Sequence, residues 1–292
     1  MYQYIWLTVF ILILSSPVYC QDIYCRYQQN GENYYGQVDG ETIHTLSKAP
    51  WEGGRRTGNK VRITEVQLLH PSEPQKIIGI SGSFKDSWAG REPFKTIRWF
   101  SKTPASAASP DEEIELPQAV DTLLVETELV AIIGKKVKNA SPQEAKEAIF
   151  GYTIGNDMVG DVTSYHQIAG EPLDQEEVLL SSGLKMGDKF SPYGPFIYTG
   201  VDWNNRERVL IVRNEESGKE LVYKHNTNNF LYPPEKIVSD LSKVFSLNPG
   251  DVIFTGTTGA LPAQAGDEMI VTVEGLGEIR NKLVAPKEYS EE

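Results

Sequence analysis

The sequence predicts an α+β fold in which strands dominate. Short apolar segments bounded by turn residues recur along the chain, only two segments have helix signals, and no internal repeat is visible. The chain has 292 residues, of which 40% are hydrophobic. This length allows one large domain, or a small domain beside a larger one, with a sizeable core.

The first twenty residues have the pattern of a secretory signal peptide. Residues 1–14 form a short apolar run, and Val18 and Cys20 are at the small-residue positions of a cut after Cys20. We therefore expect residues 1–20 to be removed and the protein to be secreted, or to reside in a secretory-pathway lumen or a periplasm. An uncleaved anchor is the alternative, although the run is short for a membrane span. Cys25 would then be the only cysteine, so the mature domain would depend on its core rather than on a disulfide.

The chain is strongly acidic. Its formal net charge is -12 at pH 7, and its isoelectric point is about 4.9. Nucleic acids and anionic membranes have the same sign of charge and would repel such a surface. We therefore expect no nucleic-acid partner and no membrane partner after signal cleavage.

Residues 21–76 are expected to form a small N-terminal β domain. The pairs Asn30-Gly31 and Asp39-Gly40 separate alternating segments and favour tight hairpin turns. The expected strands lie at residues 23–27, 34–38 and 42–46. A small antiparallel sheet is the simplest structure for this segment.

Residues 77–288 are expected to form the larger domain, followed by a tail at 289–292. A helix is predicted to begin at Ser141, because Ser141 and Glu144 have the spacing of a capping box and Pro142 suits the first turn. The second helix is predicted at residues 234–247. Three later strands are predicted at residues 252–255, 268–273 and 278–280.

Three acids stand in or at the end of apolar segments. Glu126 and Glu128 lie inside the run 123–133, and Asp157 ends a run that begins at Ile149. Side chains two residues apart on a strand point to the same side. Isolated buried carboxylates are too costly to keep unless a cation, a proton or a basic partner compensates them. A hard divalent cation such as Mg²⁺ or Ca²⁺ is the simplest solution, and three hydrogen-bonded structural acids are the alternative.

Several motifs follow one another in a characteristic order, and Lys185 precedes the fourth of them. They lie at residues 125–129, 133–136, 151–157, 190–195 and 250–257. Together they resemble the fumarylacetoacetate hydrolase family over nearly the whole mature chain. The resemblance implies a fumarylacetoacetase-like mixed β-roll with a small N-terminal β domain, usually dimeric, so we expect a homodimer. It also implies a Mg²⁺, Mn²⁺ or Ca²⁺ ion held by Glu126, Glu128 and Asp157.

The resemblance further implies which residues contact the substrate. Lys185 would lie near the substrate oxyanion, and Gly256 with Thr257 would bind a carboxylate or carbonyl oxygen, so that Lys185 and Thr257 are the expected catalytic residues. A metal that polarises a carbonyl stabilises an enolate. We therefore expect a metal-dependent hydrolase that cleaves a C–C bond of a small β-diketo or oxo acid. Keto–enol tautomerisation and decarboxylation pass through the same enolate and are the alternatives.

The sequence departs from the family pattern where a water-activating base is expected. Hydrolases of the family have a histidine about eight residues beyond the strand at Ile78, and here Ser87 stands at that place. A serine cannot take a proton near neutral pH without its own base. A replacement would have to come from His70, His166 or His225, for each of which a structural role is the simpler expectation. A metal-binding pseudoenzyme is therefore a further alternative.

Overall fold

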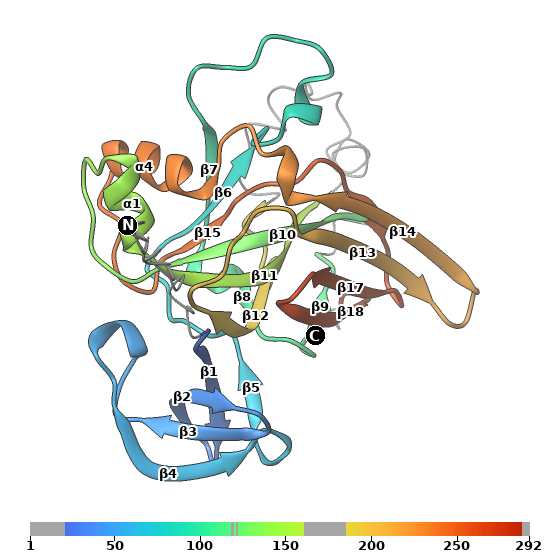
Figure 1. Ribbon diagram of the computed structural model, residues 1–292. Coiled ribbons are helices and arrows are strands. Elements are labelled where there is room, and N and C mark those ends of the chain that lie inside the picture. Colours follow the sequence, from blue (N-terminus) through green and yellow to red (C-terminus); the bar gives the residue numbers. More distant parts are fainter. Residues whose placement is uncertain (1–20, 118–119, 121, 161–184, 288–292) are drawn as a thin grey trace, which may run out of the picture.

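The computed structural model describes residues 21–117, 120, 122–160 and 185–287 (Figure 1). Two mixed β-sheets and two α-helices make up the described part, which confirms the predicted strand-dominated fold. The predicted signal peptide, His166 and the predicted tail lie outside the described residues. No helix within the described ranges is long and apolar enough to cross a membrane.

The larger sheet contains thirteen strands and joins the N-terminal strands to the rest of the protein. Along its main path the strands are β4 (Arg56–Arg62), β3 (Thr42–Leu46), β2 (Glu32–Asp39), β1 (Ile23–Gln29), β12 (Ser191–Tyr198), β11 (Ile149–Gly160), β10 (Leu123–Ile133), β15 (Val252–Phe254), β6 (Ile77–Ser81) and β7 (Arg98–Lys102). Three short strands pair with members of this path: β5 (Gln67–Leu69), β8 (Ala107–Ala108) and β16 (Leu261–Ala263).

The smaller sheet has five strands and packs against the larger one. Its order is β14 (Lys219–Asn226), β13 (Glu207–Asn214), β17 (Glu268–Val273), β18 (Gly277–Val284) and β9 (Glu113–Glu115). Neighbours in this sheet run antiparallel, except for the parallel pair of β18 and β9.

The predicted N-terminal hairpins form, and their sheet continues into the larger one. Asn30 and Gly31 have φ angles of 52° and 83°, the left-handed backbone that a tight hairpin turn requires. Strand β1 pairs antiparallel with β2 on one side and with β12 on the other. Figure 1 shows these blue strands projecting from the rest of the protein while remaining joined to it through β1.

Both predicted helices form and lie side by side (Figure 1). Helix α1 (Pro142–Ala148) has the expected capping box: Ser141 Oγ accepts the Glu144 N–H at 3.3 Å, and the Glu144 carboxylate accepts the Ser141 N–H at 2.8 Å. Helix α4 (Pro234–Val244) buries its apolar face. It ends earlier than predicted because Phe245 adopts an extended backbone, with φ at -145°.

The alternation of β10 separates two kinds of side chain. Val125 and Leu129 belong to the main core, which includes Leu210 of β13 and Val271 of β17. The residues at positions 126 and 128 point the other way, because faces alternate along a strand. Glu126 and Glu128 therefore share the face opposite the main core.

Candidate active site

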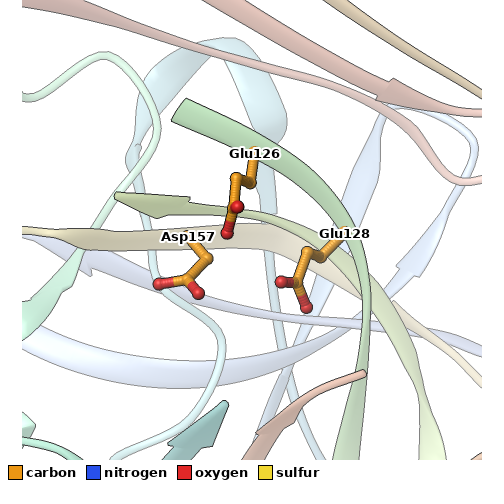
Figure 2. A group of neighbouring side chains, drawn as sticks. All are labelled: Glu126, Glu128 and Asp157. Atoms are coloured by element: carbon orange, nitrogen blue, oxygen red, sulfur yellow. The ribbon is translucent and has the colours of Figure 1, made fainter. Parts of the chain in front are cut away.

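Strand pairing brings the three predicted acids together. Glu126 of β10 lies directly opposite Asp157 of β11 in the antiparallel register, and Glu128 follows on the same face of β10. One carboxylate oxygen from each residue lies within 4.8 Å of the others. Figure 2 shows the three side chains converging on one small space. The sequence-based expectation that these acids meet therefore agrees with the structure.

Lys185 also lies at this cluster. Its Nζ donates hydrogen bonds to Asp157 Oδ2 at 2.7 Å and to Glu126 Oε2 at 3.2 Å. The ammonium group also lies 4.6 Å from the centre of the Phe100 ring. Asp157 and Glu126 raise the pKa of Lys185 against the opposing effect of its burial, so this side chain is an ammonium.

Sequence reasoning missed a second lysine in the cluster. Lys102, at the end of β7, is fully buried, and its Nζ donates to Asp157 Oδ1 and, at 3.0 Å, to the Phe190 carbonyl. Its local sequence, Arg98-Trp99-Phe100-Ser101-Lys102, shows no alternation that would distinguish a buried lysine from a surface one. Strands β7 and β11 are far apart in the chain, and the order of strands in the sheet brings Lys102 and Asp157 together.

The three acids differ in how their charge is compensated. Burial raises the pKa of Glu126 to about 7 despite the nearby Lys185. Burial and the neighbouring acids raise the pKa of Glu128 well above its ordinary value. Burial acts in the same direction on Asp157, but Lys102 and Lys185 outweigh it and lower the pKa of that carboxyl. The side chains of the site therefore compensate the charge of Asp157 and leave Glu126 and Glu128 close to protonation.

The donor set fits a hard divalent cation. Among the described residues, no lysine or arginine forms an ion pair with Glu128, and its one hydrogen bond is the Gly256 N–H at 2.6 Å. A cation shared by the three carboxylates would supply the missing positive charge. Oxygen ligands alone suit Mg²⁺, Mn²⁺ or Ca²⁺ better than softer metals.

The turn after β15 requires glycine at position 256. Gly256 has a φ of 95°, and a Cβ at this position would overlap Ser83 Oγ, so only glycine fits. The next residue, Thr257, lines a pocket of about 420 Å³ that also contacts Glu126. The other polar residues of the pocket wall are Ser81, Ser87, Arg91, Glu92, Arg98 and Thr258. The predicted residues Gly256 and Thr257 thus lie between the acid cluster and an open pocket.

No histidine of the described chain lines this pocket. Ser87 lies in the wall, where the family pattern places its histidine. His225 lies behind Thr257, with Nε2 at 3.5 Å from Thr257 Oγ1, and burial together with the Arg208 guanidinium lowers its pKa to about 2. His70 makes a hydrogen-bonding contact with the Ser72 carbonyl through Nδ1 at 2.7 Å and is absent from the pocket lining.

The two mixed sheets and the acid cluster define a strand-dominated fold with a candidate site for a divalent cation beside a pocket. Residues 82–284 match the family model described as Fumarylacetoacetate (FAA) hydrolase C-terminal. Residues 24–71 match a second model, described as Rv2993c-like, N-terminal. The first match covers more than half of the chain, so the chain belongs to the fumarylacetoacetate hydrolase family and is an enzyme of that superfamily. The resemblance seen in the sequence is confirmed.

Two curated relatives are 30% identical to the chain. One is the fumarylacetoacetate hydrolase domain-containing protein 2 homolog of Dictyostelium discoideum, matched over 77% of this chain and 76% of the relative. The other is the mitochondrial oxaloacetate tautomerase fahd2 of Xenopus laevis, matched over 76% of this chain and 69% of the relative.

A solved structure has the same architecture over almost the whole described chain. The 5-carboxymethyl-2-hydroxymuconate delta-isomerase of Mycobacterium smegmatis superposes with a TM-score of 0.76 at 28% identity, covering 90% of this chain and 99% of that protein. The named relatives thus include a tautomerase and an isomerase.

Proposed function

We propose that this protein is a metal-dependent tautomerase of small oxo acids. The observation that carries the proposal is a pocket lined by Glu126 of the acid cluster and by Thr257, with no histidine from the described chain. Such a site can stabilise an enolate, and the described part of its wall lacks the histidine that the family pattern provides to activate water. Interconversion of keto and enol forms needs only the first of these abilities.

Each site residue has a separate role in this proposal. Glu126, Glu128 and Asp157 would hold the cation, which would polarise the substrate carbonyl and favour its enolate. Thr257 would orient a carboxylate or carbonyl oxygen through its N–H and hydroxyl. Lys185, an ammonium beside Glu126, would stabilise the negative charge that develops on the enolate oxygen, and solvent would supply the proton to the enolate carbon. The enol loses its acidic O–H proton to solvent, so the proton count balances.

Hydrolytic C–C cleavage, the reaction first expected from the resemblance, stays a prediction that the same assays test. It needs a base that takes a proton from water. Ser87 has no such capacity near neutral pH. His225 is a poor base because burial and Arg208 hold its pKa at about 2.

Two arginines favour a substrate with a second carboxylate. Arg91 and Arg98 line the same pocket as Glu126, and neither forms an ion pair with a carboxylate of the described residues. A guanidinium matches a carboxylate with two parallel hydrogen bonds. The name of the Xenopus laevis relative makes oxaloacetate the first substrate to test.

The test follows ultraviolet absorbance of enol-oxaloacetate and of acylpyruvates in the presence of Mg²⁺ or Mn²⁺. We expect faster enol–keto relaxation of oxaloacetate that Glu128→Gln abolishes, with no release of product acids from acylpyruvates. The matched control is Glu220→Gln, which changes an exposed glutamate on β14. Acid release that depends on Glu128 would support hydrolysis instead. No activity with metal bound would indicate a pseudoenzyme.

We also propose that the chain enters a secretory pathway and assembles as a homodimer. The pattern of residues 1–20 supports the first proposal, and the family resemblance supports the second. A mature N-terminus other than Gln21 after expression in a secreting host would contradict the cleavage site. Sedimentation of the mature protein as a monomer would contradict the dimer.

A further inference from the structure

A fully buried arginine lies beneath the substrate turn. Arg208 is on β13 of the smaller sheet, opposite His225 of β14, and its exposed fraction is 0%. No carboxylate of the described chain lies within ion-pair distance of it. A buried charge is costly and is rarely kept without a partner of opposite charge. In the described chain the hydrogen-bond partners of this guanidinium are therefore groups other than carboxylates.

The guanidinium is directed at backbone carbonyls of the larger sheet. Its Nη1 donates to the Gly256 carbonyl at 2.9 Å and, more weakly, to the Thr127 carbonyl at 3.4 Å. The planar group lies 4.5 Å from the centre of the Phe84 ring, and its Nε has no partner among the described residues. Arg208 thus places its charge against the peptide that joins Gly256 to Thr257.

His225 fixes the other side of the guanidinium. Arg208 Nη2 lies 2.8 Å from His225 Nδ1, and an arginine can only donate, so Nδ1 is the acceptor. The proton of this neutral imidazole is therefore on Nε2, the nitrogen nearest Thr257 Oγ1. Thr258 Oγ1 also lies 2.8 Å from Nδ1, which ties the following residue of the turn to the same imidazole.

The Gly256–Thr257 peptide links Arg208 to the pocket. The C=O and N–H of a trans peptide point in opposite directions. Because Arg208 holds the Gly256 carbonyl, the N–H of Thr257 points away from Arg208, and Thr257 is a residue of the pocket wall. No described residue accepts this N–H. Hydrogen bonds in series polarise one another, so a cation on the carbonyl strengthens the N–H as a donor.

The Thr255–Gly256 peptide contacts the acid cluster instead. The N–H of Gly256 donates to Glu128, so it supports the acid cluster rather than the substrate. The two peptides of this turn therefore serve the cation and the ligand separately, and of these two peptides Arg208 bonds only to the second.

We propose that Arg208 is a positioning residue: it orients and polarises the Gly256–Thr257 peptide so that the Thr257 N–H binds an anionic oxygen of the ligand. The inference rests on the proposed function in one respect, namely that this oxygen belongs to an oxo acid. Arg208 does not itself touch the ligand.

The test compares binding of oxalate, a stable mimic of an oxo-acid enolate, to the Mn²⁺-loaded protein by titration calorimetry. Arg208→Met fills a similar volume without a charge and should remain folded, because apolar replacements of buried charges are often neutral or stabilising. We expect it to weaken oxalate binding at least about tenfold, as loss of a charge-assisted hydrogen bond would. The affinity for Mn²⁺ alone should stay within about threefold of the wild-type value, less than half that free-energy change.

Two further variants separate a positioning role from a structural one. Arg208→Lys retains a cation that can donate to the Gly256 carbonyl, and we expect it to recover part of the lost oxalate affinity. Arg213→Met changes another arginine of β13, half-buried and paired with Glu268 at 2.6 Å, and should leave oxalate binding unchanged.

Three results would overturn the inference: wild-type oxalate affinity in Arg208→Met, an equal loss of Mn²⁺ and oxalate affinity, or an equal effect of Arg213→Met. Wild-type protein that binds oxalate but fails every tautomerase assay would overturn the proposed reaction and leave the role of Arg208 standing. Absence of oxalate binding by the wild-type Mn²⁺ form would overturn both.

Discussion

Glu128 accepts the backbone N–H of Gly256 at 2.6 Å. This hydrogen bond joins the acid cluster on β10 to the turn that presents Thr257 to the pocket. A change in the charge of Glu128 therefore affects both the acid cluster and this turn. Burial and the neighbouring acids raise the pKa of this carboxyl well above its ordinary value, and it has no ion-pair partner in the described chain.

Glu128→Gln separates the charge of this residue from its hydrogen bond. The amide oxygen can still accept the Gly256 N–H, but the variant has only two carboxylates for a cation. We expect the affinity for Mn²⁺ to fall at least about tenfold, or ~1.4 kcal/mol. Without metal, at pH 8, the variant should be at least as stable as the wild type, because a neutral amide costs less to bury than a carboxylate. Calorimetric titration and thermal unfolding in EDTA measure the two quantities, and unchanged Mn²⁺ affinity would refute the assignment of Glu128 as a ligand.

The effect of metal on thermal stability should increase with pH. The folded-state pKa values of Glu126, about 7, and of Glu128 lie above those of an unfolded chain. Their contribution to stability is therefore complete below the unfolded pKa and is lost as pH rises through the folded pKa. A cation binds the deprotonated carboxylates and competes with their protons. We expect the rise in Tm caused by Mg²⁺ to grow between about pH 6 and pH 8.

The control for this pH dependence is the double variant Glu126→Gln, Glu128→Gln. It removes both carboxyls whose pKa is raised. The Tm of the metal-free wild type should fall between about pH 6 and pH 8, and the Tm of the metal-free double variant should not. A Mg²⁺ shift of the wild-type protein that stays constant or shrinks over this range would contradict the assignment of these acids as ligands.

The sequence predicted the acid cluster because two local rules combined there. Alternation along a strand put Glu126 and Glu128 on one face, and the burial cost of carboxylates called for a common partner. The hairpin turn at Asn30-Gly31 was equally predictable, since its backbone requirements are local.

The buried cations could not be predicted in the same way. Lys102 meets Asp157 across 55 residues of sequence, and Arg208 reaches the Gly256 carbonyl from the other sheet. Both contacts depend on the order of strands within and between sheets, which no local pattern specifies. The junction of β1 with β12 was missed for the same reason.

Lys102→Met should destabilise the protein strongly. It removes a buried ammonium that donates to Asp157 and to the Phe190 carbonyl, and it leaves Asp157 with Lys185 as its remaining ion-pair partner in the described chain. Breaking a buried pair in this way costs about 3 kcal/mol or more. Urea unfolding of the metal-free protein measures the free energy.

A surface pair provides the comparison for Lys102. Lys224→Met breaks an exposed pair with Glu207, 3.8 Å long, and should change stability by less than about 1 kcal/mol. A double-mutant cycle of Lys102→Met with Asp157→Asn should give a coupling energy of about 1 kcal/mol or more. Additive effects of the two changes would show that Lys102 does not stabilise Asp157.

Ser87→His should introduce hydrolysis of acylpyruvates. Ser87 lies in the pocket wall, with its Oγ at 3.5 Å from the Thr257 carbonyl, so an imidazole there would be close to the substrate turn. A positioned base can accelerate proton removal from water by about 100-fold or more. We expect acid release at that level, with a pH profile that rises through a pKa of about 6.5, the ordinary value for histidine. Ser87→Asn, which is similar in size but not basic, is the control. If the histidine variant releases no more acid than the asparagine variant, the missing base at position 87 is not what limits hydrolysis.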